Sequence, residues 1–490
     1  ALLAIDDDGG PGTDTILRFT AATSGTFFLN ARAWEDDAGA TLTGGYRITA
    51  DLGPPQSPLD TIDWGTAVSD TSVTVYFATA GQNLSGETAI RSWTAPERAA
   101  AMAALATFSA VTPLTFTQVG TAAGADFVLT LADLGADILG QMQTPPGVGY
   151  GDFNATSGAW TANGLMPGGL GFVTLIHEFG HGLGLAHPHD NGGDSEIMQG
   201  VISDFSSFGT HGLNYGVFTT MTYNDGAPGA IAGLQATPMA LDIAVLQAKY
   251  GVNPSTNSGA TIYTLPTGST GFFTSIWDVS GIDTIRALGS GAAIIDLRPA
   301  SLLNEIGGGG FLSRGVTASG GFTIAAGSVI ENASGGSGAD QITGNSANNQ
   351  LTGNAGNDTL NGGAGGDKLN GGAGADTLNG GAGGSDSANY AGSSVRVDVD
   401  LGAGVGAGGD AQESACFRKR RPLRSPAFRA LDASSGRVSC SAQRRRSAGR
   451  RWRRRHRARR LRENSRGRVA GATLHGADLR GSGSCPPHRH

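Results

Sequence analysis

A nine-residue repeat constrains the fold of this chain more than any other feature. Five in-phase copies fill residues 335–379, reading GGSGADQIT, GNSANNQLT, GNAGNDTLN, GGAGGDKLN and GGAGADTLN. Glycine lets the backbone take left-handed turns. A disordered glycine-rich linker has the same composition but not five in-phase copies. The repeat therefore predicts stacked turns of parallel β-structure. Their narrow apolar core should consist of Ile342, Leu351, Leu360, Leu369 and Leu378.

The same repeat predicts calcium binding. Its glycine turns aim carbonyl oxygens inward, and its aspartates add the carboxylates that a hard cation prefers. Successive turns alternate sides, so calcium should lie between turns 18 residues apart. Asn349 opens the second side without a charge, and we expect weaker binding there. The predicted calcium ligands are Asp340, Asp358, Asp367 and Asp376.

The stretch HEFGHGLGLAH, which begins at His177, indicates a metal site. On a helix, His177 and His181 lie four residues apart on one face and can bind one metal ion together. Glu178 is turned by about 100° from His177, beside the metal, where a general base belongs. Gly184 can end the helix in a left-handed conformation, so that His187 supplies a third nitrogen. A lone histidine is usually a satisfied polar residue, but this many fixed residues in one short motif favour a metal site.

The motif resembles that of the metzincin zinc peptidases, which continue to a methionine turn. Thr220-Met221-Thr222-Tyr223 resembles this Met-turn, and Pro188 after the third histidine resembles the serralysin family of that clan. The segment TPMALDIAVLQAKYGVN (237–253) is similar to the one that joins the serralysin peptidase domain to its C-terminal domain. The nonapeptides resemble RTX repeats. The chain is thus identified as a serralysin-type metzincin with RTX repeats.

This resemblance implies a catalytic mechanism. One Zn²⁺ would be bound by His177, His181 and His187, and it would lower the pKa of a bound water toward about 7. Glu178 would take the proton of that water and pass it to the leaving amine. Tyr223 would bind zinc, leave it when substrate binds, and donate a hydrogen bond to the oxyanion. Several Ca²⁺ ions would stabilise the repeats.

The expected architecture is multidomain. An α+β metzincin peptidase domain is followed by a parallel RTX β-roll, with a partial β-sandwich at the N-terminus and a disordered tail. The predicted boundaries are 1–53 for the sandwich module, 54–250 for the peptidase domain, 251–412 for the β-roll and 413–490 for the tail.

Capping signals predict two helices of the peptidase domain. Thr94 and Glu97 have the spacing of a capping box, which predicts a helix that runs to about Val111. Thr237 is predicted to cap a second helix, with Pro238 at its first position.

Two further elements should frame the metal site. The helix that carries the histidines should begin near residues 169–172 and bury a stripe of Leu175, Phe179 and Leu183. Residues 127–131 are predicted to form a strand. By resemblance, this strand is the exposed sheet edge along which an extended substrate lies. An ordinary core strand is the alternative.

The composition changes abruptly near residue 413. Residues 413–490 hold 23 of the 34 Lys and Arg residues and 4 of the 41 Asp and Glu residues of the chain. The remaining 11 basic and 37 acidic residues give residues 1–412 a net charge of −26. All three cysteines also lie in the tail, so residues 1–412 have no disulfide. The tail lacks hydrophobic periodicity and is predicted to be disordered, as expected of an out-of-frame translation.

The leading hypothesis is a secreted, extracellular zinc endopeptidase that acts on protein or peptide substrates. We expect a monomer that binds no nucleic acid and inserts into no membrane, since no run of 18 apolar residues exists. The resemblance implies type I secretion for the intact protein. One alternative is a calcium-dependent β-roll binding or surface protein with an inactive peptidase-like domain, but an inactive enzyme has no need of Glu178. Another is a nucleic-acid binder that acts through the arginine-rich tail.

Overall fold

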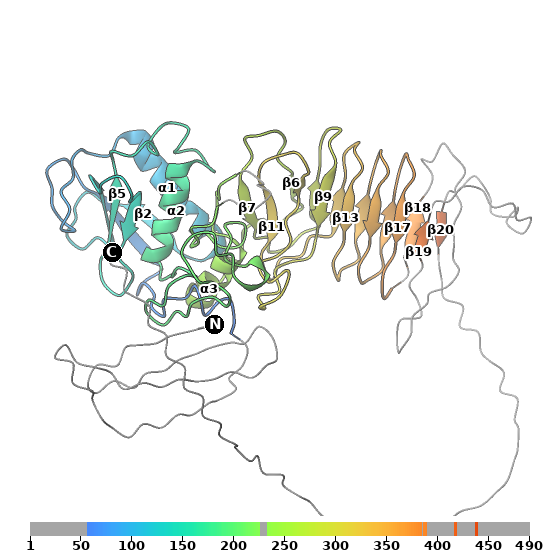
Figure 1. The fold of residues 1–490 in the computed structure, drawn as a ribbon, viewed down its shortest axis with the longest axis horizontal. Helices are drawn as coiled ribbons and strands as arrows, with labels where there is room; N and C mark the ends of the chain where they lie inside the picture. Colours follow the sequence, from blue (N-terminus) through green and yellow to red (C-terminus); the bar gives the residue numbers. More distant parts are fainter. Residues whose placement is uncertain (1–55, 226–232, 385, 390–415, 419–436, 440–490) are drawn as a thin grey trace, which may run out of the picture. The chain divides into compact units, whose positions relative to one another are not determined.

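The computed structural model describes residues 56–225, 233–384, 386–389, 416–418 and 437–439 (Figure 1). All of them belong to one compact unit, residues 1–442. The predicted sandwich module, residues 1–53, lies outside the described residues, as does most of the predicted tail.

A five-stranded sheet forms the first part of the fold, in the order β2-β1-β3-β5-β4. Its strands pair in parallel except β4, which runs antiparallel to β5. The strands are β1 (Ser72–Phe77), β2 (Thr115–Gln118), β3 (Phe127–Ala132), β4 (Gly140–Met142) and β5 (Gly149–Asn154).

The interpretation of residues 127–131 as the sheet edge is wrong. β3 lies between β1 and β5, and all six of its residues are buried. Its sequence FVLTLA is almost continuously apolar, as expected of a strand covered on both faces. The edge beside the metal-site helix is instead β4, which has only three residues and no apolar alternation that would reveal it in the sequence.

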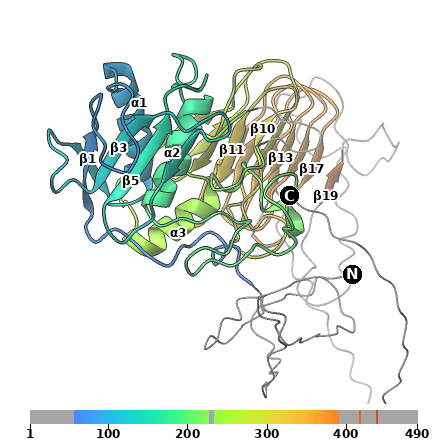
Figure 2. The ribbon, with the colours of Figure 1, turned by 60° about the vertical axis from the view of Figure 1, so that its left-hand side comes forward.

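Three helices accompany this sheet: α1 (Ala95–Val111), α2 (Leu170–Gly182) and α3 (Ala240–Tyr250). A short 3₁₀ turn covers Thr210–Gly212. α1 and α2 pack against each other and share one hydrophobic core with the sheet (Figure 2). The capping box of α1 is confirmed, because the backbone N–H of Thr94 donates to Glu97 Oε2 at 2.7 Å.

The predicted start of α3 is wrong by two residues. Met239, not Thr237, precedes the first helical residue, Ala240. Asp242 is the residue that fixes this boundary, because its Oδ2 accepts the backbone N–H of Met239 at 2.8 Å. The hydroxyl of Thr237 instead accepts the backbone N–H of Ser275 at 3.1 Å.

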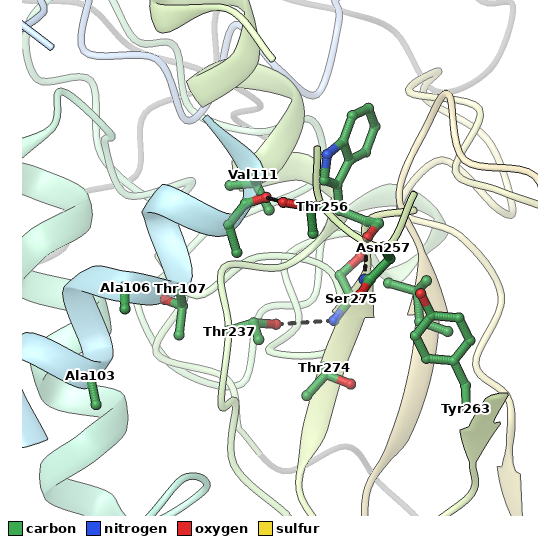
Figure 3. Close-up of a pocket in the computed structure, with 13 residues that line it drawn as sticks. Ala103, Ala106, Thr107, Val111, Thr237, Thr256, Asn257, Tyr263, Thr274 and Ser275 are labelled. Atoms are coloured by element: carbon green, nitrogen blue, oxygen red, sulfur yellow. Dashed lines mark hydrogen bonds between the residues drawn. The ribbon is translucent and has the colours of Figure 1, made fainter. Parts of the chain in front are cut away.

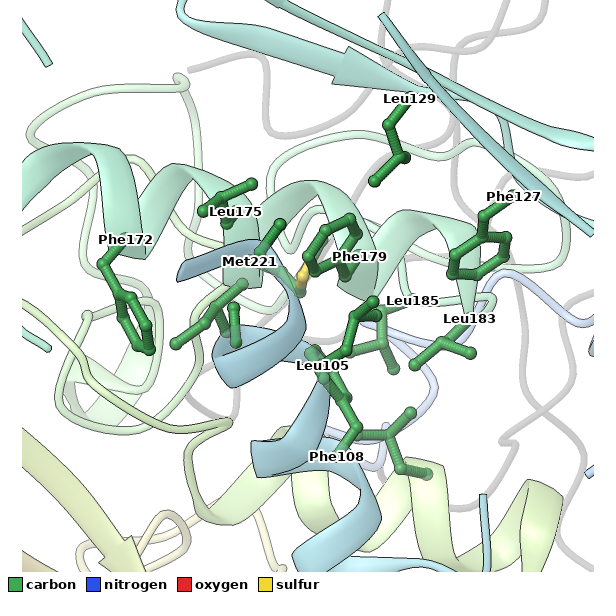
Figure 4. Close-up of a cluster of buried hydrophobic side chains, with 14 of the residues drawn as sticks. Leu105, Phe108, Phe127, Leu129, Phe172, Leu175, Phe179, Leu183, Leu185 and Met221 are labelled. Atoms are coloured by element: carbon green, nitrogen blue, oxygen red, sulfur yellow. The ribbon is translucent and has the colours of Figure 1, made fainter. Parts of the chain in front are cut away.

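The buried stripe of α2 is confirmed. Leu175, Phe179 and Leu183 are completely buried and lie in the hydrophobic cluster that Figure 4 shows. The ring of Phe179 packs on Phe127 of β3 and on Phe153 of β5, with centroids 6.4 and 6.0 Å apart. This packing fixes the rotation of α2 about its axis, and with it the face on which the histidines lie.

The second part of the fold is a roll of short strands, and Figure 1 shows many of them as a row of yellow and orange arrows. Two of its sheets follow the orders β10-β9-β13-β15-β17-β19 and β20-β18-β16-β14-β12-β8-β6, and β11 pairs in parallel with β7. The strands are β6 (Ile262–Thr264), β7 (Phe273–Ile276), β8 (Thr284–Arg286), β9 (Ala293–Asp296), β10 (Arg314–Gly315), β11 (Gly321–Ile324), β12 (Asn332–Ser334), β13 (Gln341–Thr343), β14 (Gln350–Thr352), β15 (Thr359–Asn361), β16 (Lys368–Asn370), β17 (Thr377–Asn379), β18 (Ser387–Asn389), β19 (Cys416–Arg418) and β20 (Arg437–Ser439).

The repeat forms parallel strands and the predicted apolar core. Ile342 pairs with Leu360 and Leu360 with Leu378 on one sheet, while Leu351 pairs with Leu369 on the other. All five side chains are at most 1% exposed. Glycine is required in the turns: a Cβ at Gly374, which has φ +138°, would overlap the carbonyl oxygen of Gly356.

The predicted tail contains two short strands, so the expectation of disorder is wrong for these residues. β19 and β20 pair antiparallel with β17 and β18, respectively. The last parallel turns of the roll leave an edge of unpaired N–H and C=O groups, which an extended segment of almost any sequence can satisfy. Backbone pairing of this kind leaves no hydrophobic pattern by which it could be predicted.

A cavity of about 400 Å³ lies between α1 and β7 (Figure 3). Thr107 of α1 and Thr274 and Ser275 of β7 are among the residues that line it. The N–H of Ser275 donates to Thr237 Oγ1 at 3.1 Å beside it. Its lining contains no carboxylate, imidazole or thiol. The cavity therefore lacks the usual side-chain ligands of a catalytic metal ion.

Candidate metal centre

Three imidazoles converge at the C-terminal half of α2. His187 Nε2 lies 3.1 Å from His177 Nε2 and 2.9 Å from His181 Nε2. Three nitrogens on a tetrahedral zinc are about 3.3 Å apart, given Zn–N distances of about 2.0–2.1 Å. The structure thus brings together the three histidines that the sequence predicted, at nearly the spacing that one zinc ion requires.

The opposite nitrogens fix the tautomer of each ring. His177 Nδ1 lies 2.7 Å from the carbonyl oxygen of Thr220, and His181 Nδ1 lies 3.0 Å from that of Leu185. His187 Nδ1 lies 2.7 Å from Asp190 Oδ2. Since these oxygens only accept hydrogen bonds, each Nδ1 must carry the proton. All three Nε2 lone pairs then point at one another, an arrangement that a cation relieves.

Burial keeps the imidazoles of His177 and His181 neutral. Burial and the neighbouring His187 lower the pKa of His177 to about 3. Burial, followed by the charges of His177 and His187, holds the pKa of His181 well below its ordinary value. Neutral imidazole is the form that binds a metal, so the histidines are prepared for a ligand role at neutral pH.

Glycine is required at two positions, one inside α2 and one just after it. Gly184 has φ +84°, as predicted, and a Cβ there would overlap the carbonyl oxygen of Thr66. A Cβ at Gly180 would lie 2.6 Å from the sulfur of Met221. Gly184 lets the chain reverse and bring His187 back over α2, while Gly180, inside α2, leaves room for the sulfur of Met221.

Asp242 holds the Met-turn in place, a role that the sequence did not reveal. It is completely buried on α3 and accepts hydrogen bonds from the hydroxyl of Thr219 at 2.6 Å and from the N–H of Thr220 at 2.7 Å. Burial raises its pKa even against these bonds. Met221, which follows, is 0% exposed. The helix α3 is therefore tied to the loop whose Thr220 carbonyl orients His177.

Asp190 is a second residue that the motif did not reveal. Burial alone would raise its pKa, but the hydrogen bond and charge of His187, the backbone N–H of Gly192 and the nearby His189 together outweigh burial and lower the pKa. It lies three residues after the last histidine, a spacing at which an Asp could have been noted as an orienting partner. The neighbouring His189 stacks on His187 with ring centroids 4.6 Å apart.

Glu178 follows His177 on α2 and is buried against the edge strand of the sheet. It is 6% exposed, and burial raises its pKa to about 8. A Cβ added to Gly140 on strand β4 would come within 2.9 Å of Glu178 Cγ, so glycine is needed for this close approach of the sheet edge. The carboxylate therefore lies between the metal-site helix and the sheet edge.

Tyr223 borders the histidines on the side open to solvent. Its ring is 4.8 Å from the ring of His187 and 5.7 Å from that of His177, measured between centroids. It is 39% exposed. Burial, with the nearby charges of Glu178 and two aspartates, raises its pKa to about 12. Its phenol is thus protonated and able to donate a hydrogen bond.

The repeat aspartates form two ladders inside the turns of the roll. The N–H of Asp340 donates to Asp358 Oδ1 at 2.8 Å, and the N–H of Asp358 donates to Asp376 Oδ1 at 3.1 Å. On the other side the N–H of Asp367 donates to Asp386 Oδ1 at 3.0 Å. Asp386 was not predicted, because the repeat slips by one residue before it.

These ladders leave buried carboxylate oxygens without hydrogen-bond partners. Oδ2 of both Asp358 and Asp367 is buried and unpaired. Burial raises the pKa of each to about 6. Unpaired carboxylate oxygens beside inward-facing carbonyls are the oxygen ligands that calcium prefers, so these residues fit the predicted ion.

Asn349 satisfies its position without an ion. Its Oδ1 accepts the N–H of Asn345 at 2.8 Å, and its Nδ2 donates to the carbonyl of Glu331 at 3.0 Å. An amide supplies both donor and acceptor, whereas a carboxylate only accepts. This geometry supports the expectation of weaker calcium binding at the start of the second side.

A further group of buried carboxylates lies at the start of the roll. Asp283 is 0% exposed, and its Oδ2 has no hydrogen-bond partner. Its N–H donates to Glu331 Oε2 at 2.8 Å, and Tyr263 donates to Asp278 Oδ2 at 2.5 Å. These residues lie outside the nonapeptides, and their spacing carried no repeat by which they could be found.

Comparison with known proteins gives one family match and several curated relatives. The RTX calcium-binding nonapeptide repeat matches residues 334–369 and 352–384. Metallopeptidase AprA of Pseudomonas marginalis is 31% identical over 281 residues, 52% of this chain and 55% of its own length. Serralysin C of Dickeya chrysanthemi is 33% identical over 330 residues, 61% of this chain and 65% of its own length. The chain thus spans roughly half to two thirds of these curated relatives. Among the described residues, no helix is long and apolar enough to cross a membrane.

Proposed function

We propose that this chain, a serralysin-type metzincin with RTX repeats, is a secreted zinc endopeptidase that hydrolyses peptide bonds of extracellular proteins and is stabilised by calcium. The observation that carries the proposal is the convergence of three Nε2 lone pairs, from His177, His181 and His187, beside the buried Glu178. The metallopeptidase relatives support it. Hydrolysis of casein by the chain in zinc and calcium, abolished by a chelator and restored by zinc, tests it.

The three histidines would hold one zinc ion, which would supply a Lewis acid that lowers the pKa of water and polarises a carbonyl. Their Nδ1 partners keep the rings in place. Glu178 takes a proton from the attacking water and returns it to the leaving amine. A dication nearby favours the ionised carboxylate and offsets the raised pKa that burial gives Glu178. The phenol of Tyr223, by its position, donates a hydrogen bond to the developing oxyanion.

Strand β4 is the proposed binding edge for an extended substrate. It pairs with β5 on one side, and no other described strand pairs with it. Its first residue, Gly140, approaches Glu178 closely. A peptide added to this edge would gain main-chain hydrogen bonds, which do not depend on sequence, and would place its backbone beside the metal centre.

Replacing Tyr223 by Phe tests the role of its hydroxyl. We expect kcat to fall about 100-fold, because one donor to the oxyanion is lost. KM and zinc content should stay within about twofold, because the ring and the histidines remain. Steady-state kinetics and metal analysis on the same preparation measure both. An unchanged kcat would show that the hydroxyl takes no part.

Removing calcium at neutral pH should disorder residues 335–384. The ladder aspartates repel one another without cations, and the thin apolar core cannot offset that repulsion together with the entropy of ordering. Circular dichroism in a calcium chelator should lose the β signal of the roll, and millimolar calcium should restore it. A spectrum insensitive to calcium would contradict the assignment.

The calcium-free roll should also lose stability as pH rises. Burial raises the pKa of Asp358 and Asp367 to about 6, above their ordinary value. The folded state therefore binds more protons than the unfolded state between about pH 4 and pH 6, and stability falls across this window. Thermal unfolding of calcium-depleted protein, followed by circular dichroism, should show a midpoint that decreases from pH 4 to pH 6 and then levels off. In saturating calcium the trend should reverse, because calcium needs ionised ligands. As a control, replacing both residues by Asn should weaken the decrease.

A further inference from the structure

The loop from Ile202 to Ser207 presents an exposed aromatic ring beside the metal centre. Phe205 is 65% exposed, and one face of its ring stacks on Tyr223, with centroids 5.3 Å apart and an interplanar angle of 26°. Tyr223 in turn contacts the rings of His177 and His187. Phe205 is therefore one ring away from the proposed reaction centre, with its other face open to solvent.

The loop is held in the conformation that presents this ring. Ser206 has φ +59°, a left-handed conformation that a non-glycine residue seldom adopts. Its N–H donates to Asn224 Oδ1 at 2.6 Å, and Asn224 Nδ2 donates to the carbonyl of Ser207 at 3.2 Å. Asn224 is 4% exposed and directly follows Tyr223. A buried side chain thus ties the strained turn to the residue that Phe205 covers.

Hydrogen bonds within the loop add to this restraint. The N–H of Ile202 donates to Ser207 Oγ at 2.8 Å, and Ser203 Oγ donates to the carbonyl of Phe205 at 2.9 Å. Backbone strain persists only where the surroundings enforce it, and it concentrates at ligand-binding positions. An exposed apolar ring held in this way at the rim of a site indicates a contact surface for a ligand.

The charges nearby define what this surface accepts. Asp190 and Asp204 lie close enough to Tyr223 to raise its pKa, together with Glu178. Negative charge around the ring disfavours an acidic side chain of the substrate, whereas the open face of Phe205 favours an aromatic or large aliphatic one.

We propose that Phe205 is a specificity-determining residue, which packs one face on Tyr223 and binds with the other an aromatic or large aliphatic side chain next to the scissile bond of the substrate. This inference rests on the proposed peptidase function. A binding role for Phe205 gives a reason for the strained turn at Ser206 and for its hydrogen bond to Asn224 beside the reaction centre.

The test compares two peptides that differ only at the residues flanking the scissile bond, which are Phe and Leu in one and Ala in the other. Phe205→Ala should lower kcat/KM for the Phe/Leu peptide about 10-fold, mainly through KM, and that for the Ala peptide less than about twofold. Phe205→Tyr should keep the preference, because it keeps the ring. Ile202→Ala is the matched control: Ile202 is 91% exposed in the same loop, and its replacement should change neither value.

Equal losses for both peptides in Phe205→Ala, or an unchanged preference, would overturn the inference while leaving the peptidase function intact. A preference lost equally in Ile202→Ala would overturn it as well, because the effect would then belong to the loop rather than to the ring. A wild-type chain that cleaves neither peptide nor casein in zinc and calcium would overturn the proposed function and this inference with it.

Discussion

Glu178→Gln is expected to leave zinc bound and to lower kcat by about 1000-fold. Glutamine has nearly the same shape but cannot accept the proton of the attacking water, and general acid–base catalysis typically contributes about 10²- to 10⁴-fold. The geometry of the site favours this outcome. Glu178 is buried next to His177 on the same helix, but only the nitrogens of His177, His181 and His187 meet at the centre. KM should change little, since no ligand or sheet edge is altered.

The measurement is steady-state hydrolysis of a quenched peptide, with zinc content determined on the same sample. Glu97→Gln is the matched control: Glu97 is a buried glutamate on α1 that pairs with Arg91 at 2.8 Å, outside the metal centre. Its replacement should lower stability but leave the kcat of the folded protein unchanged. A near-normal kcat in Glu178→Gln would show that another group activates the water.

His181→Ala is expected to abolish both zinc binding and peptide hydrolysis. Two imidazoles remain, too few for a stable zinc site, and the lost ring was fixed by its hydrogen bond to Leu185. The fold should persist, because the core side of α2 is untouched. Circular dichroism should therefore resemble that of the wild type, while metal analysis shows no zinc at the peptidase site.

The matched control for that variant is His211→Ala. His211 is an exposed histidine in the turn Thr210–Gly212, away from the converging nitrogens. Its loss should leave zinc content and hydrolysis at wild-type values. Undiminished zinc in His181→Ala would refute the assignment of this histidine as a ligand.

The sequence identified correctly those residues whose spacing along the chain permits only one arrangement in the folded structure. His177 and His181 share a helix face because they are four apart, and Gly184 adopts the left-handed conformation predicted for it. The leucines of the repeat are buried because their nine-residue period matches one half-turn of the roll.

The features that the sequence did not reveal depend on contacts between distant segments. Asp242 binds the loop at Thr219 and Thr220, and nothing in the local pattern of α3 points to that partner. The sequence assigned the role of sheet edge to residues 127–131, whereas the edge is β4. Apolar content indicates that a segment is a strand, but it does not indicate which strands lie beside it. The aspartate ladder continued to Asp386 beyond a one-residue slip that broke the period.

The proposed domain boundaries and the roles of the site residues remain predictions. The part of the chain that the structure describes places the metal centre and the roll in one compact unit. The proposed function depends above all on whether the three histidines hold a single zinc ion that hydrolysis requires.

That claim is tested most directly by titrating zinc into the metal-free chain at constant calcium while casein hydrolysis is followed. We expect activity to rise linearly and to reach a plateau at about one zinc per chain, and we expect no rise for His181→Ala. Hydrolysis by the metal-free chain, or a plateau reached without zinc bound at these histidines, would contradict it.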